Sequence, residues 1–195
     1  MSNNILMRRQ SHPRSNMQGA RGIRLLKRNT IYRGRVFRLI YEVLDYGGRR
    51  LVRETVQHPG AVVVVPMIDR SHLVFVRQYR RAVNRYLLEL PAGTLGRGEH
   101  RAACARRELA EETGWKAHQL QYLGQFYTAP GFTSEQMTLF VATNLTPVMA
   151  RPEPDEFIQP VILSRREAFA KIRSGEICDA KTLIGLFVIL DRFRR

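Results

Sequence analysis

The sequence GTLGRGEHRAACARRELAEETGW, residues 93–115, decides which fold and chemistry this chain is expected to have. Three glycines between Gly93 and Gly98 favour a loop whose backbone can come close to a neighbouring group. The residues that follow contain no glycine or proline until Gly114, so they predict a helix over residues 99–112 that Gly114 ends. A glycine-rich loop should therefore lead directly into a helix.

Three glutamates crowd one face of the predicted helix. Glu108, Glu111 and Glu112 stand at positions i, i+3 and i+4, which are neighbours on a helix surface. Divalent cations such as Mg²⁺ take oxygen ligands from carboxylates and from substrate phosphates. The pattern predicts a Mg²⁺ platform. The alternative is a solvated acidic face in which Arg107 and Glu111 form an i, i+4 ion pair.

The complete spacing of the stretch resembles the Nudix box. That box consists of glycine, five residues, glutamate, seven residues, Arg-Glu, an aliphatic residue, any residue, Glu-Glu, any residue, glycine and a bulky apolar residue. Every defined position is matched between Gly93 and Trp115. The resemblance to Nudix hydrolases implies a mixed α/β fold, a Nudix-type α/β/α sandwich. It also implies a divalent metal and hydrolysis of a nucleoside diphosphate linked to another moiety.

Outside the box, the sequence is similar to the ADP-ribose pyrophosphatase branch of that family. Pro130 occupies the place of a proline that this branch carries beyond the box, although an ordinary turn is the alternative for Pro130 and Gly131. The segments at residues 58–62, 77–80 and 89–93 also look like that branch. The resemblance implies hydrolysis of ADP-ribose, or a similar nucleoside diphosphate sugar, to AMP and ribose 5-phosphate.

The resemblance also implies a set of metal ligands. Glu108 and Glu112 are expected to be the main ligands of Mg²⁺, for which Mn²⁺ can substitute. The backbone carbonyl of Ala92 joins them, Glu111 is an additional ligand, and Arg107 orients the carboxylates.

Arg80, Arg53, Glu89, Pro130 and Gly131 are expected to bind the substrate. Arg80 is the candidate phosphate clamp, because a guanidinium can hold two phosphate oxygens at once. A solvated arginine at the end of a strand is the alternative for Arg80.

By resemblance to this branch, the general base is expected to be a glutamate in a loop well downstream of the box. Glu156 is the choice, since it lies where the acidic loop 151–156 meets the next strand and since neighbouring acids would raise its pKa. A solvated acidic loop is the alternative, and Glu153 and Glu135 are rival bases.

Charge adds a further expectation about partners. The chain carries 32 Lys and Arg against 17 Asp and Glu, a formal net charge of +15. Ten of these basic residues lie in the first 41 residues, which contain no acid. Such an excess favours an anionic partner, which could be nucleic acid, a membrane surface or a phosphorylated metabolite. A nucleotide substrate would be one such partner. Binding of nucleic acid through the basic N-terminal arm, residues 1–20, stays open.

The 195 residues fit a flexible basic arm (1–20), an N-terminal β subdomain (21–57) and a Nudix domain (58–195). A solvated tail and a mitochondrial transit peptide are alternative interpretations of the arm. By resemblance, the β subdomain is a dimerisation element and the protein a homodimer.

Strands are predicted over residues 23–27, 35–44, 51–56, 61–65, 73–76, 87–90, 120–126, 137–142 and 157–163, with 73–76 as the hairpin partner of 61–65. Two further helices are predicted over residues 164–173 and 179–193, capped by Ser164 and Asp179.

Composition excludes several classes of protein. The longest apolar stretches are far shorter than the roughly 18 residues that a membrane helix needs, so no membrane partner is expected. Two cysteines without a metal-binding pattern favour a reducing compartment, hence the cytoplasm.

Two functional alternatives stay open. One is a Nudix hydrolase acting on GDP-mannose, a dinucleotide or an RNA 5′ end, and the other is a catalytically silent Nudix module that binds nucleic acid.

Overall fold

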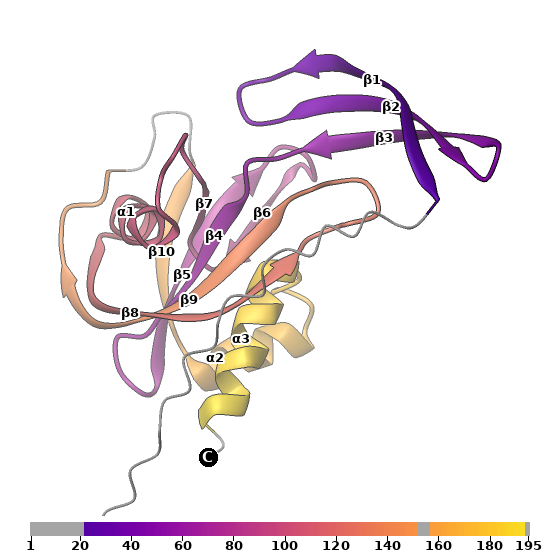
Figure 1. The fold of residues 1–195 in the computed structure, drawn as a ribbon. Coiled ribbons are helices and arrows are strands. Elements are labelled where there is room, and N and C mark those ends of the chain that lie inside the picture. Colours follow the sequence, from indigo (N-terminus) through magenta and orange to yellow (C-terminus); the bar gives the residue numbers. More distant parts are fainter. Residues whose placement is uncertain (1–21, 152–156, 194–195) are drawn as a thin grey trace, which may run out of the picture.

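The computed structural model describes residues 22–151 and 157–193, which form three sheets and three helices (Figure 1). The strands are β1 (Ile23–Arg33), β2 (Arg38–Tyr46), β3 (Arg49–Gln57), β4 (Ala61–Pro66), β5 (His72–Arg80), β6 (Arg85–Glu89), β7 (Ala92–Thr94), β8 (Trp115–Tyr127), β9 (Gln136–Pro147) and β10 (Ile158–Ser164). The helices are α1 (Arg101–Thr113), α2 (Arg165–Arg173) and α3 (Ala180–Phe193). Over the described residues, no helix is long and apolar enough to cross a membrane.

The first three strands form an antiparallel sheet that projects from the rest of the chain (Figure 1). Its β2–β3 hairpin turns through Gly47 and Gly48, whose φ angles of 58° and 84° suit glycine best. The predicted small N-terminal sheet is confirmed. Its first strand runs to Arg33, well beyond the predicted end at residue 27.

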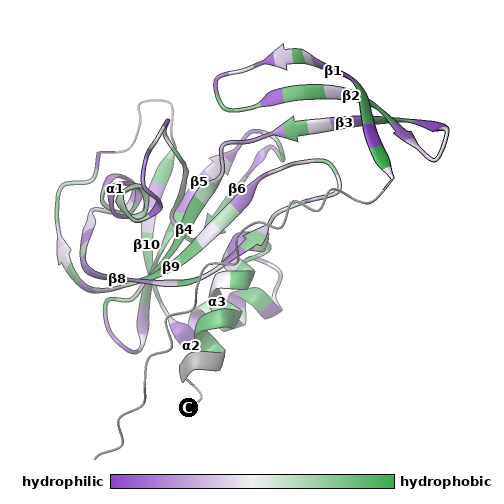
Figure 2. Cartoon of the chain, viewed as in Figure 1, coloured by the Kyte–Doolittle hydropathy of each residue, from purple (hydrophilic) through white to green (hydrophobic). Residues whose placement is uncertain are grey.

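Large apolar side chains stay exposed on this sheet, and Figure 2 shows hydrophobic segments along it. They are Ile23, Leu25, Leu26, Ile31, Tyr32, Val36, Phe37, Tyr46 and Val52. Apolar side chains gathered on one element are typical of an interaction surface. The homodimer stays a prediction, which the mass of the protein in solution would test.

The central sheet has the order β7-β4-β9-β8, and β4 runs parallel to β9. All six residues of β4 are buried, as a strand covered on both faces must be. Val62 and Val64 pack with Ala105 and Leu109 of α1. Val63 and Val65 lie in the cluster on the opposite face with Leu186 and Ile189 of α3. The predicted α/β/α sandwich is confirmed.

The third sheet has the order β10-β5-β6 and corrects one predicted pairing. Residues 73–76 belong to β5, which pairs with β10 and β6, so the predicted hairpin with residues 61–65 is wrong. Both edges of β4 are already occupied by β7 and β9. The link between β4 and β5 turns at Asp69, whose carboxylate accepts the N–H groups of Ser71 and His72 at 2.6 and 2.8 Å. This turn carries the chain from one sheet to the next.

Helix capping agrees with the sequence apart from one boundary. Gly114 ends α1 with a φ angle of 71°, Ser164 forms a capping box with Glu167, and Asp179 accepts the N–H of Thr182. However, α1 begins at Arg101 with His100 as its N-cap, so Glu99 lies in the preceding loop.

Candidate active site

Two carboxylates of α1 converge on the short strand β7. Glu112 is only 3% exposed, and its Oε2 accepts the backbone N–H of Ala92 at 3.1 Å. The carboxylate of Glu108 lies against Gly93, where an added Cβ would stand 1.9 Å from the Glu108 Cδ. Only glycine leaves room for that carboxylate, so the sequence of β7 and the position of Glu108 depend on each other.

Arg107 binds three carboxylates at once. Its Nη1 lies 2.8 Å from Glu108 Oε1 and 2.9 Å from Glu111 Oε2. On its other side, Nε donates to Glu99 Oε1 at 2.9 Å and Nη2 to Glu99 Oε2 at 3.1 Å. The ion pair between Arg107 and Glu111 therefore forms within a larger acidic cluster. One guanidinium offsets the repulsion that the crowded carboxylates would otherwise exert.

The loop before α1 is tied into the same cluster through Glu99. Hydrogen bonds from Arg107 and from the N–H of Gly96, at 2.9 Å, lower the pKa of Glu99 to about 2. The same bond to Glu99, with the charge of Glu108, raises the pKa of Arg107. Both groups are therefore charged at neutral pH, and the ion pair fixes the glycine-rich loop to the helix.

The donor groups suit a divalent cation in type. Glu108 and Glu112 face β7, which also carries the carbonyl of Ala92, and these are the oxygen donors that Mg²⁺ prefers. Glu111 accepts a hydrogen bond from Arg107. Among the described residues, no three Asp, Glu, His or Cys side chains already form a metal-binding group. Of the predicted metal ligands, Glu108 and Glu112 meet Ala92 at β7 and Glu111 pairs with Arg107 instead, and the role of all four stays a prediction.

Arg80 and Glu89 form a two-point ion pair beside β7. Arg80 Nε and Nη2 donate to the two Glu89 oxygens at 2.8 and 2.6 Å. Burial alone would raise the pKa of Glu89, but these bonds and the charge of Lys181 lower it below its usual range. Burial alone would lower the pKa of Arg80, but Glu89 and the charge of Glu112 raise it. Two of the three guanidinium nitrogens are therefore used to orient Arg80.

Pro130 and Gly131 lie in an exposed turn between β8 and β9. The turn docks on the end of β3, where the N–H of Val56 donates to the Phe132 carbonyl at 2.8 Å. The rival base Glu135 accepts the Thr128 hydroxyl at 2.7 Å and so braces the base of the turn.

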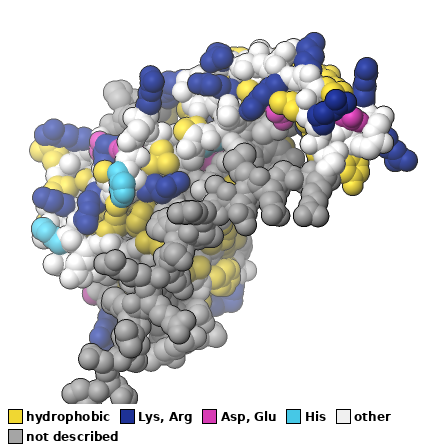
Figure 3. All heavy atoms as spheres, viewed as in Figure 1, with side chains coloured by type: hydrophobic (Ala, Val, Ile, Leu, Met, Phe, Trp, Pro, Cys, Tyr) yellow, Lys and Arg dark blue, Asp and Glu magenta, His cyan; other side chains and the backbone are white. Residues whose placement is uncertain are grey.

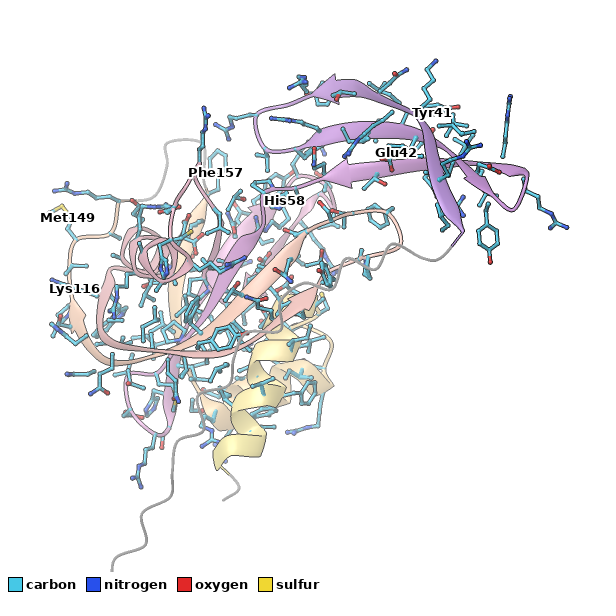
Figure 4. The ribbon with its side chains drawn as sticks, in the orientation of Figure 1. Tyr41, Glu42, His58, Lys116, Met149 and Phe157 are labelled. Atoms are coloured by element: carbon cyan, nitrogen blue, oxygen red, sulfur yellow. The ribbon has the colours of Figure 1, made fainter. Side chains whose placement is uncertain are left out.

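Arg53 lies on β3 of the projecting sheet, opposite Glu42, which Figure 4 labels away from α1. Its Nη1 donates to the carbonyl of Val52 at 2.8 Å. Its predicted contact with the substrate stays a prediction.

Glu156 and Glu153 lie outside the described residues, and the residues on either side of that segment make backbone hydrogen bonds to α1 and β5. The N–H of Arg151 donates to the carbonyl of Glu111 at 3.0 Å, and the carbonyl of Phe157 accepts the N–H of Tyr79 at 3.2 Å. Met149 and Phe157, labelled in Figure 4, lie before and after this segment. Residues 151 and 157 thus join the carboxylate helix to the residue next to Arg80.

An open cleft of about 1790 Å³ lies between the projecting sheet and the loop before α1. His58, at the junction of β3 and β4, lines it (Figure 4). Its other basic lining residues are Arg35, Arg38, Arg97, His100 and Arg101, and Glu99 is its acidic lining residue. Figure 3 shows Lys and Arg side chains spread over the same side of the molecule. This cleft suits an anionic ligand and reaches the Arg107 cluster through Glu99.

The sequence did not single out Lys181 and Thr182, which contact Glu89 and Leu90 from α3. Their one available signal was the Asp179 cap, which fixes where the first turn of α3 begins.

The family profile described as NUDIX domain matches residues 57–183. The chain belongs to the Nudix family. Its relatives include the methanol dehydrogenase activator of Bacillus methanolicus, 37% identical over 164 residues that cover 83% of this chain and 89% of the relative. The ADP-ribose pyrophosphatase of Bacillus subtilis (strain 168) is 36% identical over 160 residues, or 80% of this chain and 86% of that protein. A crystal structure of an ADP compounds hydrolase matches with a TM-score of 0.78 and 26% identity, covering 88% of this chain and 94% of that one. The predicted resemblance to the ADP-ribose pyrophosphatase branch is confirmed.

We predict that the Glu99–Arg107 pair makes stability depend on pH in acid. Because the pKa of Glu99 falls from an ordinary 4.5 to about 2, its contribution is complete above pH 4.5 and is lost as the pH falls toward 2. Glu99→Gln should lower the urea unfolding midpoint at pH 6, and the difference from the unmodified protein should vanish near pH 2. Arg107→Met should remove the same pH-dependent part. A difference that stays constant across this range would contradict the prediction.

Proposed function

We propose that this Nudix protein is a divalent-metal-dependent pyrophosphatase that hydrolyses ADP-ribose, or a similar nucleoside diphosphate sugar, to AMP and ribose 5-phosphate. The observation that carries the proposal is the convergence of Glu108 and Glu112 on β7, beside a cleft with a basic lining. Two relatives supply the substrate class, because their names specify ADP-ribose pyrophosphatase and ADP compounds hydrolase.

Each group of residues has a distinct task in such a reaction. A bound divalent cation would neutralise the diphosphate oxygens and lower the pKa of an attacking water. Glu108, Glu112 and the Ala92 carbonyl would hold that cation, and Arg107 would hold the carboxylate of Glu108 in position. Arg80 would bind a diphosphate oxygen, since a guanidinium matches phosphate in charge and geometry.

A second candidate is hydrolysis of a wider set of ADP-containing compounds, favoured by the structural likeness to an ADP compounds hydrolase. The cleft is large and open, so the structure sets no tight limit on the second moiety. A panel of ADP-ribose, GDP-mannose, a dinucleotide and a 5′-capped RNA, each assayed with the same metal, would rank the substrates. Salt-dependent RNA binding without turnover would favour the nucleic-acid-binding alternative instead.

We expect ADP-ribose turnover only when Mg²⁺ or Mn²⁺ is present, with AMP and ribose 5-phosphate as products. Glu112→Gln should reduce kcat by at least about 100-fold, because it removes a negatively charged metal ligand. The measurement is product formation by chromatography, with circular dichroism to verify that the variant is folded.

Glu176→Gln provides the matched control, because Glu176 pairs with Lys171 on the surface and should leave kcat unchanged. Turnover that persists in EDTA, or a fully active Glu112→Gln variant, would overturn the assignment of the carboxylates.

For the general base we propose Glu156. Its support is the position of the neighbouring backbone, since residues 151 and 157 are bonded to Glu111 of the carboxylate helix and to Tyr79 beside Arg80. These hydrogen bonds place the two ends of the segment, residues 151 and 157, beside α1, which carries the carboxylates, and β5, which carries Arg80. Glu135 is a weaker choice, because its carboxylate already accepts the Thr128 hydroxyl.

Glu156→Gln should lower kcat at least about tenfold while leaving the affinity for Mn²⁺ nearly unchanged, because a base acts in the transition state and not in metal binding. Steady-state kinetics and a Mn²⁺ titration measure the two effects separately. Full activity of Glu156→Gln, together with a crippled Glu153→Gln or Glu135→Gln, would move the base to one of those residues.

A further inference from the structure

A buried carboxylate connects the C-terminal helix to β5. Glu89 is 1% exposed, and both of its oxygens accept hydrogen bonds from Arg80. The Nζ of Lys181 in α3 donates to Glu89 Oε2 and lies 2.9 Å from Asp179 Oδ2. These four side chains carry two positive and two negative charges, so the cluster is neutral.

A second hydrogen bond joins α3 to the backbone that leads into β7. The buried hydroxyl of Thr182 accepts the N–H of Leu90 at 2.8 Å and donates to Asp179 Oδ2 at 2.6 Å. Only Pro91 separates Leu90 from Ala92, whose own N–H binds Glu112. Thus α3 fixes the backbone on which the carboxylates of α1 converge.

Arg80 presents the exposed end of this cluster. Its side chain is 38% exposed, and Nη1 has no hydrogen-bond partner among residues 22–151 and 157–193. The charge of Glu112 also acts on Arg80, so the guanidinium lies within electrostatic reach of the carboxylate helix. The geometry leaves one nitrogen for an anion while the other two are held by Glu89.

Stability alone is a poor reason for this arrangement. Burying the charges of Glu89 and Lys181 costs free energy that the attraction within the cluster often only offsets, and apolar side chains of similar size would pack as well. The cluster instead fixes the direction of a guanidinium that a long, flexible arginine side chain would not fix by itself.

We propose that Lys181 and Thr182 are positioning residues of the active site. From α3 they hold Glu89 and the Leu90 backbone, so that Arg80 offers Nη1 to the diphosphate of the substrate. The proposal rests on the proposed function, because it takes the diphosphate as the anion that Arg80 binds. Neither residue touches the substrate, and Lys181 acts through Arg80.

The first test is a double-mutant cycle on the kinetics of ADP-ribose hydrolysis. Without Lys181, Glu89 keeps Arg80 as its neighbouring cation and draws it inward, so Lys181→Met should raise KM about tenfold with kcat changed less than about threefold. Arg80→Ala should raise KM at least as much. The double variant should match Arg80→Ala, because Lys181 has no effect once Arg80 is absent. If the KM of the double variant instead rises by the product of the two single effects, the proposal is overturned.

Matched controls separate positioning from general destabilisation. Lys171→Met removes the same charge from an exposed pair with Glu176 and should leave KM unchanged. Thr182→Val removes the hydroxyl at constant shape and should raise KM, whereas Thr182→Ser keeps the hydroxyl and should restore it. The Thr182 pair also carries the test if Lys181→Met does not fold. Equal KM values for Thr182→Val and Thr182→Ser would overturn the role of that residue.

Binding of inorganic diphosphate, measured by calorimetry without metal, separates this proposal from the proposed function. If the unmodified protein does not hydrolyse ADP-ribose, the proposed function fails, but weaker diphosphate binding by both Arg80→Ala and Lys181→Met would still support positioning. If diphosphate binding is the same in all three proteins, the positioning proposal fails whatever the substrate proves to be.

Discussion

Arg107 places one guanidinium between the carboxylates of Glu99, Glu108 and Glu111. Glutamates at i, i+3 and i+4 repel one another on an isolated helix, and the sequence places three of them within two turns. Contact with Arg107 allows these charges to share a small space before any cation arrives. It also ties the loop before α1 to the helix through Glu99.

The rest of the fold holds the two sides of the site at a fixed distance. The buried strand β4 pairs with β7 on one edge, and α1 packs on one of its faces through Ala105 and Leu109. Because α1 and β7 both contact β4, the carboxylates of α1 meet β7. Gly93 permits the approach, since any side chain there would overlap Glu108. On the opposite face, α3 reaches the same backbone through Thr182 and Leu90.

Local pattern predicted the parts of the structure that depend on near neighbours in sequence. The glycine loop, the carboxylate face of α1 and the Gly114 cap all depend on residues within one or two helical turns, and the spacing of the Nudix box could be matched directly. The strand pairing of β5 could not be predicted in this way, because its apolar residues suit either sheet and its partner β10 lies far along the chain. The contact of Lys181 with Glu89 joins residues 92 positions apart, so no periodicity could indicate it. A short strand inside the glycine loop, β7, was also not predicted, since three glycines weaken the strand signal.

The central claim is that Glu108 and Glu112 hold a divalent cation against β7, and Mn²⁺ binding to a Gly93→Ala variant tests it most directly. The added Cβ would overlap Glu108 and displace its carboxylate, whereas Gly124→Ala adds the same methyl group where nothing lies within 4 Å. Mn²⁺ binding followed by paramagnetic resonance should weaken at least about tenfold in Gly93→Ala and remain unchanged in Gly124→Ala. A folded Gly93→Ala variant that binds Mn²⁺ as tightly as the unmodified protein would contradict the account.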